Sequence, residues 1–337
     1  MQIDRLPATP EAYRSWYELT KVAMAADVPD LPPRTHTAIV AGLTVGWPGN
    51  RDEHWIAHDG DTLLGFAELS FPVYDNLDNA SAEIVVHPDH RRLGVGTGLL
   101  TRVVERIRAE GRKRLVLTAR EPLPGSGVRR SEAGARFAER HRAHRALVEV
   151  GRRLELSDVD ATRLDASLAE AWSHAAGYSL LTWTDRTPDD AVADIAALDS
   201  SFLDEAPLGD LAWEPEKVDV ARIRAAEAAI VARGYKRRHV AARHDATGRV
   251  VAWTTLGLVP EYPEHGWQMI TLVSPAHRGH RLGTVIKLEN FAAVRREWAG
   301  LRRIDTYNAE VNDHMVAIND LMGFRPMDRS VDWQLDL

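Results

Sequence analysis

Hydrophobic and polar positions follow the same order twice along the chain. Residues 54–71 ("HWIAHDGDTLLGFAELSF") and 239–258 ("HVAARHDATGRVVAWTTLGL") each hold two strand-like apolar runs around a polar turn, which predicts a hairpin. Residues 96–111 ("GTGLLTRVVERIRAEG") and 283–298 ("GTVIKLENFAAVRREW") show helical apolar spacing. Each predicted helix leads into another strand, "RLVLTA" or "RIDTYNA". The pattern therefore indicates one domain design used twice.

The repeat fixes the expected domain organisation. Pro88 and Pro275 each begin the pattern Pro-x-His-Arg-x-x-x-x-Gly. A chain of 337 residues is also too long for one ordinary core. We place the boundary in the polar connector near residue 158, giving domains 1–158 and 159–337. The order of strands and helices in each half predicts a mixed α/β fold with a central sheet.

Composition narrows the classes of function. The formal net charge is −7, which disfavours nucleic acid as the main partner, since phosphate backbones favour a basic surface. Cysteine is absent, which excludes disulfides, thiolate nucleophiles and cysteine metal sites in this chain. There is no apolar run of 18 residues and no signal-peptide pattern. We therefore predict a cytoplasmic protein without a membrane partner or a metal, either a monomer or a homodimer.

The stretch "VHPDHRRLGVGTGLL" (residues 86–100) is built to bind an anion. A strand ends, a glycine-rich turn follows, and a helix begins. The unpaired N–H groups of the first helical turn therefore lie at the positive end of the helix dipole. A P-loop would need a Gly-Lys-Ser/Thr end, and a dinucleotide fingerprint would need glycine where Leu99 stands. The remaining pattern is Arg-x-x-Gly-x-Gly, and a purely structural strand–helix junction stays an alternative.

This pattern resembles the signature of the GNAT superfamily, the acyl-coenzyme-A-dependent N-acetyltransferases. Arg91, Gly94 and Gly96 match its core; in the second copy Arg278, Gly279 and Gly283 match, and Arg281 takes the place of the first core glycine. Residues 306–324 ("TYNAEVNDHMVAINDLMGF") resemble the family's strand, asparagine, helix and closing Gly-Phe. The duplication is similar to tandem GNAT proteins, of which mycothiol synthase is one kind. The resemblance implies two GNAT-like domains, each with a mostly antiparallel sheet flanked by helices.

The resemblance also implies an acetyl-CoA site. The turn would hold the coenzyme pyrophosphate, and the preceding strand would bond the pantetheine arm through its backbone. The residues so implied are Ile84, Val85, Val86, Arg91, Arg92, Leu93, Gly94, Val95, Gly96 and Thr97 in the first copy, and Leu272, Val273, Arg278, Gly279, His280, Arg281, Leu282, Gly283, Thr284, Asn308 and Asn312 in the second. Asn308 and Asn312 are equally well explained as helix caps.

The implied reaction is direct attack of a small, cationic amine on the thioester, which needs a base for the amine and an acid for the thiolate. Glu83, Glu264 and His265 are the base candidates, although each is also explained as a surface or strand residue. Asn319 stands at the position where the family often has a tyrosine that serves as the acid.

The second half carries the fuller thioester segment, so we expect the chemistry there. The alternative is a catalytically silent acyl-CoA sensor or scaffold. The acceptor pocket is expected near residues 20–50 and 200–235.

Overall fold

The computed structural model describes residues 1–201 and 207–337, so part of the predicted acceptor region, residues 202–206, lies outside the described residues. The described chain divides into two compact units. Unit 1 comprises Met1–Glu149, Leu208–Glu214 and Asp328–Leu337, and unit 2 comprises Val150–Pro207 and Pro215–Met327. Neither unit is one continuous stretch. The predicted boundary at residue 158 stays a prediction about domains.

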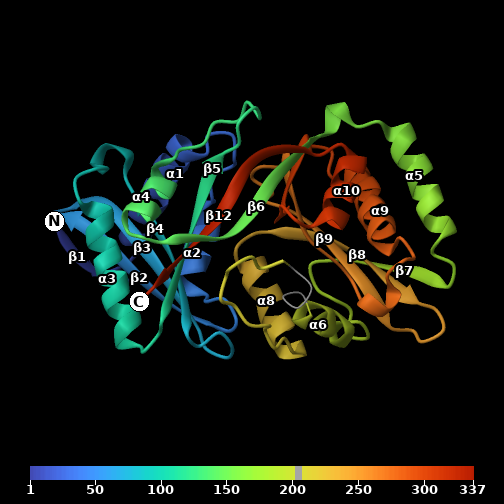
Figure 1. Cartoon of the computed structure of the whole chain (residues 1–337), viewed down its shortest axis with the longest axis horizontal. Helices are drawn as coiled ribbons and strands as arrows, with labels where there is room; N and C mark the ends of the chain where they lie inside the picture. The colour runs from blue at the N-terminus through green and yellow to red at the C-terminus, as the bar shows by residue number, and fades with distance from the viewer. Residues whose placement is uncertain (202–206) are drawn as a thin grey trace. The chain divides into compact units, whose positions relative to one another are not determined.

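Unit 1 is built on strands in the order β1-β2-β3-β4-β5-β12 (Figure 1). The pair β4–β5 is parallel, and β1–β2, β2–β3, β3–β4 and β5–β12 are antiparallel. The strands are β1 (Gln2–Arg5), β2 (Asn50–Asp59), β3 (Thr62–Pro72), β4 (Asn79–Val86), β5 (Arg114–Pro122) and β12 (Arg325–Asp336), of which β12 belongs to unit 1 from Asp328.

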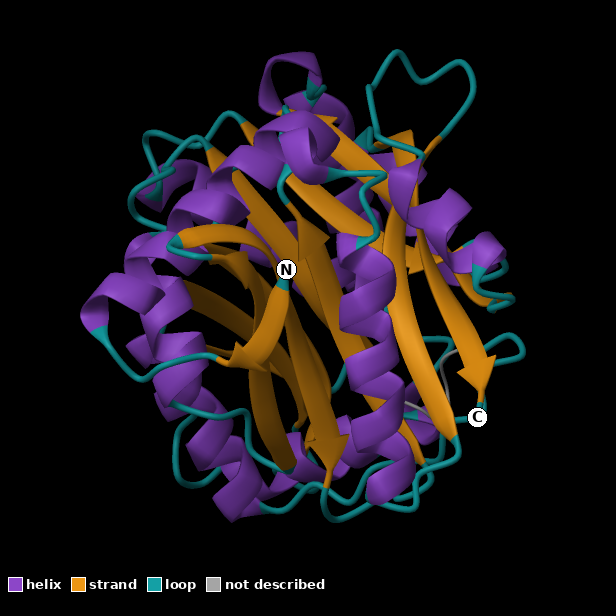
Figure 2. Ribbon diagram, turned by 90° about the vertical axis from the view of Figure 1, so that its left-hand side faces the viewer, coloured by secondary structure: helices purple, strands orange, loops and turns teal. Residues whose placement is uncertain are grey.

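Helices cover both faces of the unit 1 strands (Figure 2). One face packs under α3 (Val95–Ala109) and α4 (Ala133–Arg140), with Leu99, Val103 and Ile107 fully buried against the sheet. The other face packs under α1 (Pro10–Asp27) and α2 (His36–Thr44), where Trp16 stacks on Phe66 at 3.8 Å between ring centroids. Strand β6 (His144–Glu155) begins in unit 1 and ends in unit 2.

Unit 2 repeats this plan with strands in the order β11-β10-β9-β8-β7. They are β7 (Tyr178–Thr184), β8 (Lys236–His244), β9 (Val250–Leu258), β10 (His265–Val273) and β11 (Arg303–Ala309). Only β10–β11 is parallel among the four pairs of this series. Its helices are α5 (Ala161–Ser173), α6 (Val192–Ser200), α8 (Val220–Ala232), α9 (Leu282–Glu297) and α10 (Asp313–Met322).

The helices of unit 2 also divide between two faces of the strands (Figure 1). Helices α5, α9 and α10 bury Leu164, Phe291 and Met322 on one face, while α6 and α8 bury Ile195 and Ile223 on the other. The predicted mixed α/β fold of two GNAT-like halves is confirmed. No described helix is both long enough and apolar enough to span a membrane.

Candidate functional site

The two predicted phosphate turns follow the same backbone path. Each strand, β4 or β10, is followed by a short 3₁₀ turn (Pro88–His90 or Pro275–His277) and then by the glycine turn. The second turn residue is left-handed in both copies, with φ 67° at Arg92 and 86° at Gly279. The fourth is left-handed as well, with φ 88° at Gly94 and 52° at Arg281. Arg281 therefore adopts the conformation that its glycine counterpart provides, and the second turn keeps its shape.

Both turns end on helices whose first N–H groups lack a side-chain cap. The residues that precede α3 and α9, Gly94 and Arg281, form no side-chain capping hydrogen bond. Several other helices do have a side-chain cap: Thr9, for example, accepts from Ala12 N at the start of α1. Uncapped N–H groups at the positive end of a helix dipole suit an anion. The backbone of both turns thus fits a pyrophosphate.

The third feature that the two turns share is a glycine in the first turn of the helix. A Cβ on Gly96 would lie 3.5 Å from Val86 and 3.1 Å from the ring of Phe137, and one on Gly283 would lie 3.6 Å from Val273 and 3.4 Å from Ile318. Each helix start is thus held against the end of its strand and one side chain of α4 or α10. Gly96 and Gly283 are structural counterparts, and so are Phe137 and Ile318.

The arginines of the turns are less available than the sequence suggested. Arg91 donates two hydrogen bonds of 2.8 Å to Asp27 and one of 3.2 Å to the carbonyl of Val86. Its charge is therefore paired with α1, and it fixes the turn rather than offering a free cation. Arg281 forms an exposed pair with Glu170 at 2.8 Å. In the first copy the exposed Arg92 remains as the predicted phosphate contact.

The strands that lead to the turns separate from their parallel neighbours. Strand β4 pairs with β5 only over Asn79–Ala82, and β10 pairs with β11 only over His265–Trp267. Both strands continue for several residues beyond this pairing. The predicted pantetheine contacts Ile84, Val85 and Val86, and likewise Leu272 and Val273, lie in these separated parts. An extended ligand arm can bond to backbone left unpaired in this way.

Only the second copy has a bulge at the separation. Gln268 pairs with Leu256 of β9, but Thr271 pairs with Thr254, so two residues of β10 oppose one of β9. The side-chain amide of Gln268 donates 3.0 Å to the carbonyl of Thr255, the residue opposite the bulge. The hydroxyl of Thr306 donates 3.0 Å to the carbonyl of Gln268. Strand β4 pairs with β3 without such a shift. A bulge leaves one residue unpaired and re-aims its backbone.

A buried acid–base cluster begins at the first residue of β10. His265 Nε2 lies 2.9 Å from Asp305 Oδ2, and Arg153 donates 2.7 and 2.6 Å hydrogen bonds to the two Asp305 oxygens. His265 also stacks on Trp267 at 4.9 Å. Burial opposes ionisation of Asp305, but the bonds from Arg153 and His265 outweigh it and hold the pKa of this carboxyl below its usual range. The cluster thus places a buried imidazole beside a carboxylate that Arg153 holds in position.

The two glutamates predicted as bases lie in different settings. Glu83 is exposed on β4 and accepts a 3.0 Å hydrogen bond from Arg34. Glu264 is exposed just before β10, where its carbonyl accepts from the amides of Arg302 and Arg303. His265 is the first residue of β10 and is buried. The histidine is therefore the base candidate with an orienting partner.

The asparagines predicted as site residues in the second copy form hydrogen bonds within the protein. Asn312 caps α10, accepting 3.2 Å from Met315 N, which is the capping role left open by the sequence. Asn319 is fully buried, and its amide donates 3.1 Å to Asn308 Oδ1. Sequence reasoning missed the other two members of this network, Lys287 and Arg152. The only local signal was a lysine within the apolar stripe of the predicted helix.

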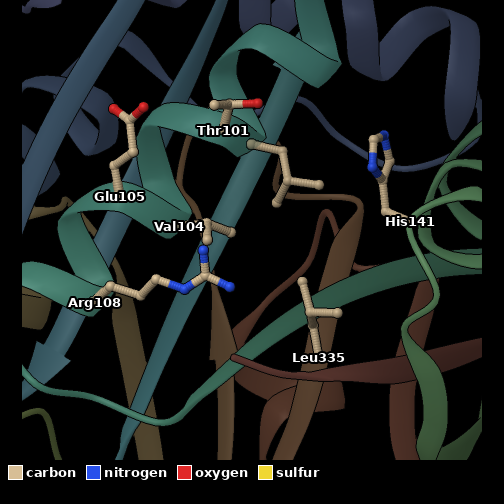
Figure 3. A pocket seen from close by; sticks show the side chains of 7 residues that line it. Thr101, Val104, Glu105, Arg108, His141 and Leu335 are labelled. Atoms are coloured by element: carbon tan, nitrogen blue, oxygen red, sulfur yellow. The ribbon is translucent and has the colours of Figure 1, made fainter.

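A shallow pocket of about 360 Å³ lies along α3 in unit 1. Figure 3 shows Thr101, Val104, Glu105 and Arg108 projecting from α3, with His141 and Leu335 across from them. It contains none of the residues predicted for the coenzyme or for catalysis.

The fold and the two strand–turn–helix sites are similar to those of the GNAT acetyltransferases. Comparison with known proteins gives the same result: residues 13–126 match the model of the acetyltransferase (GNAT) family. A tandem GNAT protein from the clavulanic acid biosynthesis pathway has a similar structure, with a TM-score of 0.83, 29% identity and coverage of 99% of this chain and 98% of that one. Residues 13–126 thus form a GNAT-family domain, and the chain as a whole is similar to a tandem GNAT protein.

Two curated relatives are mycothiol acetyltransferases. The chain is 36% identical over 158 residues to that of Geodermatophilus obscurus and 36% identical over 95 residues to that of Parafrankia sp.. These matches cover 47% and 26% of this chain, and they span only 46% and 28% of the relatives' own length. A GCN5-related N-acetyltransferase from Sphaerobacter thermophilus shares the fold over 99% of this chain and 95% of its own, with a TM-score of 0.66 and 15% identity.

Proposed function

We propose that the protein transfers the acetyl group of acetyl-CoA to the amine of a small, cationic acceptor, and that the chemistry takes place in the C-terminal copy. The observation that carries this proposal is the combination in unit 2 of an uncapped phosphate turn, a separated strand pair and a bulge at the point of separation. The N-terminal copy has the turn and the separation but no such bulge.

The geometry suggests how each part would act. The turn from Arg278 to Thr284 would hold the pyrophosphate, and Leu272 and Val273 would bond the pantetheine arm. A backbone N–H released by the bulge would stabilise negative charge on the thioester oxygen, which is the usual task of fixed donors in acyl transfer. The amine nitrogen forms a bond to the carbonyl carbon, the carbon–sulfur bond breaks, and the thiolate takes up a proton.

His265 is our candidate for the base that removes the proton from the amine. Its Nε2 lies 2.9 Å from the carboxylate of Asp305, and a carboxylate beside an imidazole can stabilise the imidazolium that forms when the ring takes up a proton. Asn319, predicted at the acid position, is enclosed and bonded to other side chains. The acid therefore stays unassigned, and Glu83 and Glu264 remain weaker candidates for the base.

Matched substitutions in the two turns test which copy does the chemistry. Gly96→Asp and Gly283→Asp each add a negative charge to the first turn of the helix that would bind the phosphate, and Gly96→Ala and Gly283→Ala control for the added bulk against the strand end. We expect Gly283→Asp to abolish thiol release and the binding of one acetyl-CoA, and Gly96→Asp to affect turnover less. Turnover that survives Gly283→Asp but not Gly96→Asp would assign the chemistry to the N-terminal copy instead.

One assay tests both the identity of the acceptor and the alternative that the protein is a catalytically silent acyl-CoA sensor. The protein is incubated with acetyl-CoA and a panel of polyamines, aminoglycosides and amino-thiol conjugates, and free thiol is monitored. The negative net charge and the mycothiol acetyltransferase relatives support a small cationic or amino-thiol acceptor. Tight binding of acetyl-CoA without thiol release for any amine would favour the sensor. We further expect a cytoplasmic protein that acts without a nucleic-acid or membrane partner, as a monomer or homodimer.

A further inference from the structure

Unit 2 encloses a lysine completely. Lys287 lies on α9, one helical turn after Gly283, with 1% of its surface exposed. Its Nζ donates a hydrogen bond to Asn319 Oδ1 and lies 3.6 Å from Met315 Sδ and 5.5 Å from the ring centroid of Phe324. Buried lysines are rare because desolvation of an ammonium is costly. This one is among five lysines in the chain.

The lysine begins a directional chain of hydrogen bonds that ends on β11. Lys287 fixes Asn319 Oδ1, so Asn319 Nδ2 is turned toward Asn308 Oδ1, at 3.1 Å. Asn308 Oδ1 also accepts 3.2 Å from Arg152, and its Nδ2 donates 3.0 Å to the carbonyl of Ala309. Each amide orientation is therefore set by the one before it. Asn308 lies three residues beyond Asp305, in the part of β11 that no longer pairs with β10.

The N-terminal copy has an apolar set at the same three positions. Gly96 and Gly283 are counterparts, so Lys287 corresponds to Leu100, which is 4% exposed. Phe137 and Ile318 are counterparts, so Asn319 corresponds to Ala138, which is 1% exposed.

The same comparison applies to the separated strands. Arg114 opposes the first residue of β4 and Arg303 the first residue of β10. Asn308, five residues after Arg303, therefore corresponds to Ala119. An apolar packing of this junction is thus compatible with the fold, and the polar chain belongs to the C-terminal copy alone.

We propose that the Lys287–Asn319 pair is a positioning device for the C-terminal coenzyme site, which holds Asn308 and the separated part of β11 in place to receive the acyl-pantetheine arm. The inference rests on the proposed function. Both members are enclosed and do not touch substrate; they act through Asn308. Since leucine and alanine are buried at the same positions in the other copy, the fold does not require a buried lysine here.

Replacing the polar residues with their apolar counterparts from the N-terminal copy separates an effect on coenzyme positioning from an effect on folding. Lys287→Leu leaves Asn319 Oδ1 buried without its donor, which is costly. The double variant Lys287→Leu/Asn319→Ala reproduces the Leu100–Ala138 pair of the N-terminal copy and removes both partners together, while Arg152 still bonds Asn308. Lys236→Leu, at an exposed lysine of β8, controls for the loss of one positive charge. For each full-length variant, the melting temperature, kcat, KM for acetyl-CoA and calorimetric acetyl-CoA affinity are measured.

We expect Lys287→Leu to lower the melting temperature by several degrees and to raise KM for acetyl-CoA at least tenfold. The double variant should regain most of the melting temperature and keep the raised KM, while Lys236→Leu behaves as wild type. Recovery of both stability and KM in the double variant, or a wild-type KM in the single variant, overturns the inference.

The proposed function and the positioning role fail in different ways. A wild-type protein that releases no thiol with any amine refutes the acetyl transfer. The calorimetric affinity then decides the role of the pair: at least tenfold weaker binding at one site of the double variant sustains it, and unchanged binding refutes it.

Discussion

The buried Lys287 makes a quantitative prediction about stability. Burial, reinforced by the nearby positive charge of Arg152, lowers the pKa of this amine from 10.5 to about 7. In the unfolded chain the amine keeps its ordinary pKa, so between pH 7 and 10.5 the unfolded state holds a proton that the folded state has lost. Stability contributed by this group therefore rises with pH across that window and is constant below it.

The size of the effect follows from the slope. One bound proton changes the free energy of unfolding by about 1.4 kcal/mol per pH unit. Between pH 7.5 and 9.5, wild type should thus gain about 2.5 kcal/mol relative to Lys287→Leu, whose leucine does not titrate.

Urea unfolding of both proteins at half-unit pH intervals measures this difference directly. All other titrating groups are shared and cancel, and the chain has no cysteine whose titration would interfere. Parallel stability curves for the two proteins would refute the reasoning, since they would mean that Lys287 titrates alike in the folded and unfolded states.

Three further predictions concern other buried charges. Burial disfavours the ionised Glu53, but hydrogen bonds from Arg106 and Arg51 and the charges of Arg5 and Arg106 hold its pKa at about 2; Glu53→Gln should cost about 3 kcal/mol at pH 7, with the gap in urea stability closing as pH falls from 4.5 to 2. Burial and the charge of Glu216 raise the pKa of Asp199 to about 6; Asp199→Asn should therefore be about 3 kcal/mol more stable than wild type above pH 6 and equal to it below pH 3.8, as measured by urea unfolding. Arg153→Leu should cost about 3–5 kcal/mol, because it removes the main partner of the buried Asp305, and Arg153→Lys should recover part of this loss in the same assay.

Local patterns predicted those parts of the fold whose contacts are close in sequence. The hairpins, the glycine turns and α3 and α9 depend on neighbouring residues, so periodicity and turn chemistry were sufficient. The partner of β12 could not be found in this way. Its residues from Asp328 to Asp336 pair with Arg114–Pro122 of β5, about two hundred residues earlier, and no local pattern specifies a partner at that distance.

The candidate site also has a part that local sequence predicts and a part that depends on distant residues. The turn residues were predictable because the motif is contiguous, and even the unexpected Arg281 keeps the left-handed conformation of the glycine it replaces. The roles of Arg91 and His265 were not predictable, because Asp27 and Asp305 reach them from other elements. Polar networks of this kind are assembled by tertiary packing, and a single sequence shows only their separate members.

The comparison of the two copies gives the strongest reason to look for chemistry in unit 2. Both copies keep the turn, and both separate the strand before it from its parallel neighbour. Only the second adds a bulge held by Gln268 and a buried amide chain headed by Lys287. Buried polar groups carry a desolvation cost that an apolar junction avoids, and Leu100 and Ala138 show that this fold can avoid it. These features cost stability, and they surround only one of the two places where a strand separates from its parallel neighbour. A functional role at that place is the best explanation for them.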